Sequence, residues 1–319
     1  MSEPQEIPAA SPGKGRRVIR HVLLWLFVVL IFYFIFRRVP MDEVVRAFKL
    51  MNPWRFFPIV ITFVAIQIAF DSYTHYWVFK RFDVRMSYRE VFEARAASTL
   101  LAGLGFFYGQ GGMAYLVNKK TGKPITEVIG CLFFLFFNTY HTILIMPTFG
   151  LLFFLDYFKQ DLAGTQELRF LIILLAVTWP VFFLSLAFWS REWKFWPRNR
   201  LKHGMFHAFH QARFRDYATV MFLRMVITLF WIIMVRAAMP ALGLEIPLGT
   251  IFAFLPLVQL AGAIPTPGRL GTSEAVWLLV FHNLAPAPLL VAMSLAWMQS
   301  VNIIRGTVGL FFVRHFTKD

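Results

Sequence analysis

The residues best suited to bind a charged ligand lie in one short stretch, Ala263-Ile-Pro-Thr-Pro-Gly-Arg-Leu-Gly-Thr-Ser-Glu-Ala275. Pro265 and Pro267 prevent a helix from continuing, because each lacks an amide donor and restricts the residue before it. Gly268 and Gly271 permit tight backbone turns. The stretch therefore predicts a helix that breaks and then restarts with unpaired amides at its new start, which suit an anionic group such as phosphate.

Two charged residues flank this break. Arg269 lies beside the free amides and could add a charged donor to a phosphate. We favour a ligand contact for Arg269 over snorkelling or pairing with Glu274, because a charge inside an apolar segment is costly and usually faces a cavity. Glu274 falls in the first turn of the new helix. Its role stays open between a ligand contact and neutralisation of the helix dipole.

Other polar side chains recur at helical spacing within apolar segments. Gln67, Asp71 and His75 are four residues apart and so share one helix face. Interhelical hydrogen bonding is the favoured interpretation, and a head-group contact or a proton relay is the alternative. One face of the last apolar segment carries a further polar set: Gln299, Asn302 and Arg305. We expect this set to close a polar pocket against Glu274.

A glycine-rich run, residues 103–112, contains Gly109 and Gln110. It is not a nucleotide loop, because it lacks the flanking strand and the Lys-Ser/Thr pair. We expect its glycines to let a turn approach a neighbouring helix closely. The sequence offers no nucleophile–base pair inside the apolar segments, and it predicts no catalytic residue, no metal site and no cofactor. The candidate binding residues are Asp71, His75, Gly109, Gln110, Pro265, Pro267, Gly268, Arg269, Gly271, Glu274, Gln299, Asn302 and Arg305.

The composition indicates where these residues lie. The chain has 319 residues, of which 58% are hydrophobic and 15% charged, and its mean hydropathy is +0.60. Soluble domains usually carry about 25% charged residues, so a soluble enzyme is excluded. The formal net charge of +15 fits cytoplasmic loops and anionic lipid surfaces better than nucleic acid. The single cysteine, Cys131, excludes an internal disulfide.

Apolar segments of near-bilayer length dominate the chain. The strong segments are Val22–Phe36, Phe57–Phe79, Thr126–Phe154, Leu168–Trp189, Tyr217–Met239 and Pro288–Val313. Two weaker segments remain: Phe92–Val117, which is interrupted by Gly, and Leu248–Leu284, which is interrupted by Gly and Pro. The predicted fold class is an all-α polytopic membrane protein with about six full transmembrane helices.

The basic residues set the orientation. If each strong segment crosses once, the basic loops 80–95 and 190–216 lie inside together with both termini, as the positive-inside rule requires. Residues 37–55 carry five cations yet must lie outside. We expect Met41–Leu50 to form an amphipathic helix on the membrane surface.

The basic loops fall on the expected sides of the membrane only if the two weak segments do not cross it. We therefore predict one re-entrant helical hairpin from the cytoplasm in residues 14–156 and another from outside in residues 157–319. Broken segments in corresponding positions of oppositely oriented halves indicate an inverted repeat. The alternative is two kinked helices and eight full crossings. Residues 14–319 are expected to form a single integral membrane domain, and residues 1–13 a disordered tail.

The pattern Pro-x-Pro-Gly-x-Leu-Gly-x-x-Glu-Ala at residues 265–275 resembles the lysylphosphatidylglycerol synthase transmembrane-region family. The resemblance extends from about Val22 to the C-terminus. It implies the lipid-translocating membrane portion of bacterial aminoacyl-phosphatidylglycerol synthases, which also occurs as stand-alone proteins.

The chain departs from the family's pattern at several charged positions. Gln110 and Met113 stand where the family usually has Glu and Arg, and Gln299 stands where Arg is expected. Phe134–Phe137 contains no charge where the family resemblance implies a Glu-Arg pair. These differences indicate a divergent member with its own substrate.

Together these features predict a membrane lipid transporter or flippase whose cargo has a polar, anionic head group. Phospholipid, glycolipid, polyprenyl-linked lipid and hopanoid all stay open as the cargo, and no nucleic acid is expected. The alternatives are a membrane partner of a separately encoded synthase or glycosyltransferase and, with less support, a lipid-modifying enzyme. The expected location is the bacterial inner membrane, with both termini cytoplasmic.

Overall fold

A computed structural model describes residues 14–103, 105–154, 166–190, 204–264 and 266–316, and throughout these ranges the regular elements are helices. In chain order, with η for short 3₁₀ turns, they are α1 (Lys14–Phe36), α2 (Met41–Leu50), α3 (Pro53–Arg81), α4 (Tyr88–Ala102), α5 (Phe106–Thr121), α6 (Ile125–Phe153), α8 (Gln166–Ser190), η2 (Gly204–Phe206), α9 (His207–Gln211), α10 (Phe214–Ala238), η3 (Met239–Leu242), α11 (Leu248–Val258), η4 (Gln259–Ala263), η5 (Pro267–Arg269), α12 (Thr272–Phe281) and α13 (Ala287–Phe316). The expected tail, residues 1–13, lies outside the described residues.

Long apolar helices form the frame of the molecule. Within the described ranges, α3, α6, α8, α10 and α13 are each long and apolar enough to cross a membrane. The apolar part of α1, Val22–Phe36, reaches that length only together with α2, from which it is bent by 89°. The predicted all-α polytopic membrane fold is confirmed.

Helix α2 occupies the segment predicted to lie on the membrane surface. Val44 and Ala47 are buried on one face, against α13 and its neighbours, whereas Arg46 and Lys49 are exposed. This one-sided burial and the sharp bend from α1 fit a helix that lies along the surface instead of crossing.

The first weak segment forms a hairpin of two short helices, α4 and α5. The amide and hydroxyl of Ser87 donate to the Glu90 carboxylate at the start of α4, and these bonds hold the pKa of Glu90 below its usual value. The two helices contain 15 and 16 residues. At about 1.5 Å per residue, neither spans the ~30 Å hydrocarbon core. Gly109 lets them pack closely, since a Cβ there would lie 2.7 Å from the Ala102 Cβ.

The second weak segment is broken at the predicted place. Helix α11 gives way to the turns η4 and η5, and α12 starts at Thr272. Gly268 and Arg269 have φ angles of 58° and 59°, in the left-handed region that glycine adopts easily and arginine adopts at a cost. Helices α11 and α12 contain only 11 and 10 residues. Each is therefore too short to cross a bilayer alone.

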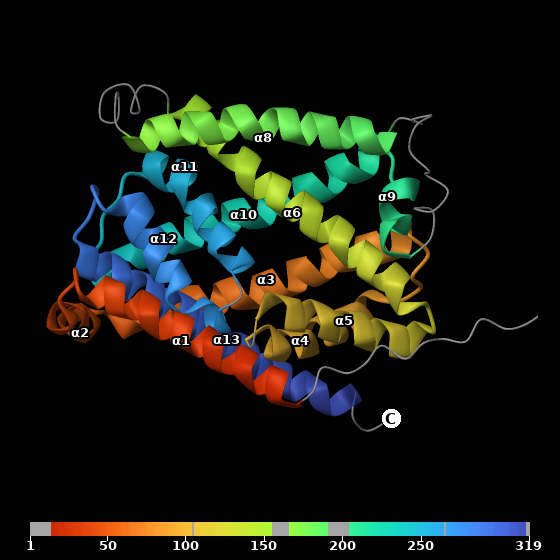
Figure 1. Cartoon of the computed structure of the whole chain (residues 1–319), viewed down its shortest axis with the longest axis horizontal. Helices are drawn as coiled ribbons and strands as arrows, with labels where there is room; N and C mark the ends of the chain where they lie inside the picture. Colours follow the sequence, from red (N-terminus) through yellow and green to blue (C-terminus); the bar gives the residue numbers. More distant parts are fainter. Residues whose placement is uncertain (1–13, 104, 155–165, 191–203, 265, 317–319) are drawn as a thin grey trace, which may run out of the picture.

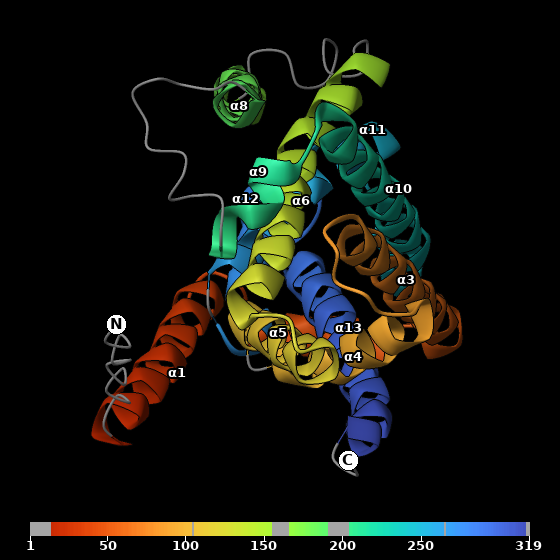
Figure 2. The same ribbon diagram turned by 90° about the vertical axis from the view of Figure 1, so that its right-hand side faces the viewer.

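The two hairpins enter from opposite ends of the bundle (Figure 1). The α4–α5 hairpin lies at the end where α1 begins and α13 ends, and α11–α12 lies at the end that carries α2. The tips meet, because the Gly268 amide donates to the Gly103 carbonyl at 3.0 Å. Figure 2 shows α8 on the outside of the bundle, where it packs on α6. This is the arrangement expected of two inverted re-entrant hairpins.

Two apolar cores support these elements. The larger core lies where α10, α11, α12 and α13 pack together, around Trp277. The smaller core joins the C-terminal part of α3 to α5, α6 and α9, around Phe134 and Phe209. Leu135 of the smaller core and Trp231 of the larger core also line the cavity described below.

Labelling of single cysteines tests the hairpins. In a chain whose buried Cys131 is replaced by alanine, we expect Arg85→Cys and Lys120→Cys to react with an impermeant maleimide from the cytoplasmic side only. Glu245→Cys and Asn283→Cys should react from the outside only. Opposite accessibility within either pair would show that the intervening segment crosses the membrane and would support eight crossings.

Candidate functional site

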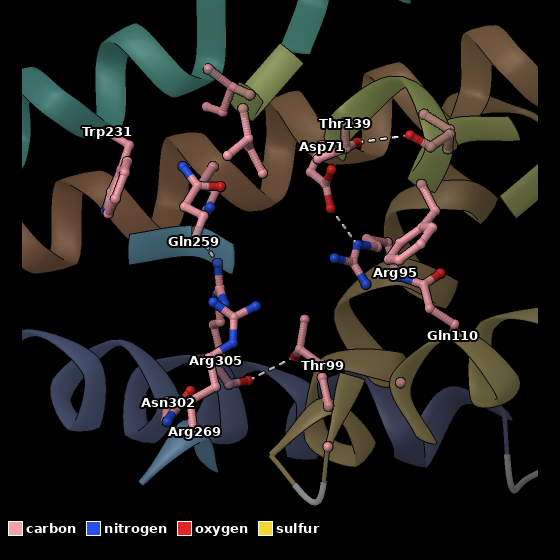
Figure 3. Close-up of a pocket in the computed structure, with 18 of the residues that line it drawn as sticks. Asp71, Arg95, Thr99, Gln110, Thr139, Trp231, Gln259, Arg269, Asn302 and Arg305 are labelled. Carbon is pink, nitrogen blue, oxygen red and sulfur yellow. Dashed lines mark hydrogen bonds and ion pairs between the residues drawn. The ribbon is translucent and has the colours of Figure 1, made fainter. Parts of the chain in front are cut away.

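A cavity of about 200 Å³ lies between the hairpin tips and helices α3, α4, α5, α6, α10 and α13 (Figure 3). The polar lining includes Gln67, Asp71, His75, Arg95, Thr99, Gln110, Arg224, Gln259, Thr266, Arg269, Asn302 and Arg305. The apolar lining comes mainly from α6 and α10 and includes Leu132, Leu135, Phe136, Ile143, Ile227 and Trp231. The cavity can therefore receive a molecule that has both a polar and an apolar part.

Asp71 of α3 forms two ion pairs in this cavity. Its Oδ2 accepts a hydrogen bond from Arg95 Nε of α4 at 2.5 Å, and its Oδ1 accepts one from Arg224 Nη1 of α10. The three side chains are only 11–18% exposed. Removal of one partner from such a buried pair leaves an uncompensated charge, which is strongly destabilising. A single carboxylate thus links three helices.

Two more arginines reach the cavity without a carboxylate partner in the part of the chain that the structure describes. Arg305 of α13 donates to Gln67 Oε1 of α3. The guanidinium of Arg269, at the tip of the second hairpin, makes neither a hydrogen bond nor an ion pair with a described residue. Among the described lining residues, four guanidinium groups face one carboxylate, Asp71. The excess positive charge suits an anion.

The polar stripe predicted on α3 faces this cavity. Gln67 and Asp71 both make interhelical bonds, as the favoured interpretation of the stripe expected. His75 lies one turn further along, and its Nδ1 donates to the Asp71 carbonyl oxygen at 2.7 Å. The same residues therefore join helices and line the site.

Helix α13 holds both hairpin tips in place. Asn302 Nδ2 donates to the carbonyl of Gly268 at 2.9 Å, and Gly268 directly precedes Arg269 in the chain. The Thr99 hydroxyl of α4 donates to the Arg305 carbonyl at 2.9 Å. With the bond between Gly268 and Gly103, these contacts close a ring through α4, α13 and the second hairpin.

The structure brings most of the candidate residues together. Those that line the cavity are Asp71, His75, Gly109, Gln110, Gly268, Arg269, Asn302 and Arg305. Pro267, Gly271, Glu274 and Gln299 are absent from the described lining, and Pro265 lies outside the described residues. Gln299 is nevertheless close: its Oε1 lies 3.7 Å from where a Cβ on Gly268 would be.

Glu274 does not close the pocket, contrary to the expectation from sequence. The residue is completely buried, and its carboxylate accepts bonds from the Gly271 amide at 2.7 Å and the Ser294 hydroxyl at 3.2 Å. Of the two roles left open, this geometry supports neutralisation of the α12 N-terminus. Asp71 and Gln67, on α3, are the residues that face Arg305 and its neighbours instead.

Sequence reasoning missed Arg95 and Arg224 as site residues. The charge pattern places Arg95 at the end of the basic loop 80–95, and it does not single out Arg224 within its apolar segment. The structure places Arg95 within α4 and Arg224 well inside α10, both on Asp71. The depth of Arg224 in an apolar helix was the available signal, because such a charge usually faces a cavity or a partner.

The position of Glu274 predicts a structural effect on mutation. Glu274→Ala would leave the buried Gly271 amide and Ser294 hydroxyl unpaired, at about 1–3 kcal/mol. We expect a lower Tm for the detergent-solubilised protein. The control is Glu93→Ala, which removes an exposed pair with Arg89 worth under about 1 kcal/mol. Wild-type Tm combined with lost lipid binding in Glu274→Ala would contradict the capping role.

Comparison with protein families agrees with this architecture. Residues 19–308 match the family described as "Lysylphosphatidylglycerol synthase TM region". The match includes both hairpins and every described residue of the cavity. No curated protein matches the chain. The family and the apolar helices together indicate a multi-pass membrane protein involved in lipid handling. The chain belongs to the lysylphosphatidylglycerol synthase TM region family.

Proposed function

We propose that this protein is a transporter or flippase that binds a membrane lipid by an anionic head group in the arginine-lined cavity. The observation that carries the proposal is the convergence of Arg95, Arg224, Arg269 and Arg305 on a cavity whose described lining has one carboxylate. Guanidinium groups suit phosphate because they are permanently charged and donate in a fixed planar geometry. A cluster of this kind inside an apolar bundle would be unfavourable without an anionic ligand or a functional need.

The form of the cavity supports a lipid over a small soluble anion. Apolar side chains of α6 and α10, such as Phe136 and Ile227, lie in the same lining as the arginines. In the proposal, the head group meets the arginines while the glycerol region contacts these side chains and the acyl chains stay in the bilayer. The two hairpins support movement across the membrane, because paired broken segments of inverted halves are typical of transporters.

The proposed orientation follows the basic loops. Both termini and the α4–α5 hairpin would face the cytoplasm of a bacterial cell, and α2 would lie on the outer surface of the inner membrane. The proposal makes the protein a carrier and not an enzyme, and it requires no cofactor. The lipid-binding cavity would be loaded from one leaflet and emptied into the other.

Loss of a single cavity arginine tests the site. We expect Arg269→Gln and Arg305→Gln each to weaken the binding of phosphatidylglycerol or phosphatidate by about 10-fold or more, since a bond to a charged group contributes ~1.5–3 kcal/mol. Native mass spectrometry with lipid titration measures the binding. Dithionite quenching of a fluorescent lipid in proteoliposomes measures translocation, which should fall in parallel.

The matched control is Arg236→Gln, which changes an arginine of α10 that is absent from the described cavity lining. We expect wild-type binding and translocation from it. Equal losses in all three variants would indicate a general charge effect and contradict the proposed site. Wild-type behaviour in Arg269→Gln and Arg305→Gln would also remove these residues from the site.

Purification in mild detergent separates the transporter from the main alternative. Co-purified lipid, identified by mass spectrometry, would support lipid binding by the cavity. A stoichiometric soluble enzyme would favour a partner subunit of a synthase or glycosyltransferase, for which the basic segment 190–216 is the suggested contact.

A further inference from the structure

We propose that the cavity selects a head group with at least two negative charges on phosphate, as in a phosphomonoester or diphosphate lipid, and that Asp71 limits the strength of this preference. The inference rests on the proposed function and narrows its cargo. Three features carry it: the ion pairs of Asp71, the two arginines that form no ion pair with it, and the absence of a second carboxylate from the described lining.

Asp71 neutralises one part of the arginine cluster. Each of its two oxygens accepts a charge-assisted hydrogen bond, one from Arg95 and one from Arg224. Arg95 on α4 and Arg224 on α10 thus each have an ion-pair partner within the protein. Their attraction for a ligand is reduced, because the negative charge of Asp71 offsets part of their positive charge.

Arg269 and Arg305 form the part of the cluster that is left for a ligand. Within the described residues, neither makes an ion pair, and the Arg305 guanidinium donates to the neutral amide of Gln67. Asn302 and Arg305 both lie on α13, and Asn302 bonds the hairpin tip that carries Arg269. Helix α13 therefore fixes the positions of both Arg269 and Arg305. One carboxylate offsets only one of the four guanidinium charges of the described lining, so an excess of three positive charges remains. That excess matches a phosphomonoester, which carries about −1.5 to −2 at neutral pH, better than a phosphodiester with one charge.

The described lining has no free carboxylate for a cationic head group. The two oxygens of Asp71 are occupied, and Glu274 is buried away from the described lining with its oxygens bonded to Gly271 and Ser294. The other described polar lining consists of neutral amides and hydroxyls, an imidazole and arginines. An ammonium group in an ethanolamine or aminoacylated head group would meet an excess of arginines and no carboxylate left for it in the described lining, which is unfavourable.

The selectivity can be measured with lipids of identical acyl chains in native mass spectrometry at pH 8. We expect the wild-type protein to bind phosphatidate and a lipid diphosphate at least about 10-fold more tightly than phosphatidylglycerol. Phosphatidylethanolamine and aminoacylated phosphatidylglycerol should not compete. Equal binding of phosphatidate and phosphatidylglycerol would overturn the inference while leaving the proposed anionic-lipid site intact. Absence of binding to every anionic lipid would overturn the proposed function itself.

Asp71→Asn tests the selectivity residue directly. It removes the one negative charge of the described lining, so both lipids should bind more tightly, and phosphatidate, with two charges, should gain more than phosphatidylglycerol, so the preference should widen several-fold. Asp216→Asn is the matched control, because the Asp216 side chain is as buried as that of Asp71, pairs with Arg81 and is absent from the described cavity lining. Its preference should equal that of the wild type. An unchanged preference in Asp71→Asn, or an equal change in both variants, would overturn the role of Asp71.

Two further measurements keep the inference testable if Asp71→Asn does not fold. Arg269→Gln and Arg305→Gln should each weaken phosphatidate binding more than phosphatidylglycerol binding, and equal losses would contradict a doubly charged ligand. Inorganic pyrophosphate distinguishes a lipid from a soluble phosphate compound. We expect it to compete weakly, because it cannot use the apolar lining, and competition as strong as that of phosphatidate would overturn a lipid cargo.

Discussion

The hydrogen bond between the Gly268 amide and the Gly103 carbonyl joins two hairpins that come from opposite ends of the bundle, and the cavity depends on it. Neither hairpin is long enough to cross a bilayer, so each must end on protein that satisfies its free backbone groups. Each tip finds a partner in the other hairpin, and the second tip also finds one in Asn302 of α13. The same contact places Arg269, the residue after Gly268, at the wall of the cavity.

The second constraint is electrostatic. Several buried guanidinium groups in one apolar bundle repel one another and lose hydration, so the fold must compensate them locally. Asp71 does this for Arg95 and Arg224, and the Gln67 amide does it in part for Arg305. These residues come from helices far apart in the sequence. The polar contacts that align α3, α4, α10 and α13 are therefore the same contacts that shape the proposed binding site.

The sequence predicted the elements well, because their signals are local. Glycine located the first broken segment, proline and glycine located the second, and the amphipathic pattern of residues 41–50 located α2. The long-range pairs were not predictable, since no local pattern says that Asp71 meets Arg95 and Arg224 or that Glu274 turns toward Ser294. Glu274 illustrates the limit: its spacing from Gly271 suits both a helix cap and a ligand contact, and only the packing of α13 distinguishes them.

The contact between the hairpin tips also has an electrical consequence. A head group that follows the proposed route passes the contact between the hairpin tips, which is a thin part of the protein between the two sides. Much of the membrane voltage would therefore drop across this contact and act on the head group there. A voltage of 100 mV acts on each unit charge with about 2.3 kcal/mol. For a doubly negative cargo that amounts to roughly 4.6 kcal/mol, directed toward the positive side. In an energised cell this force favours outward movement, and it requires no coupling ion.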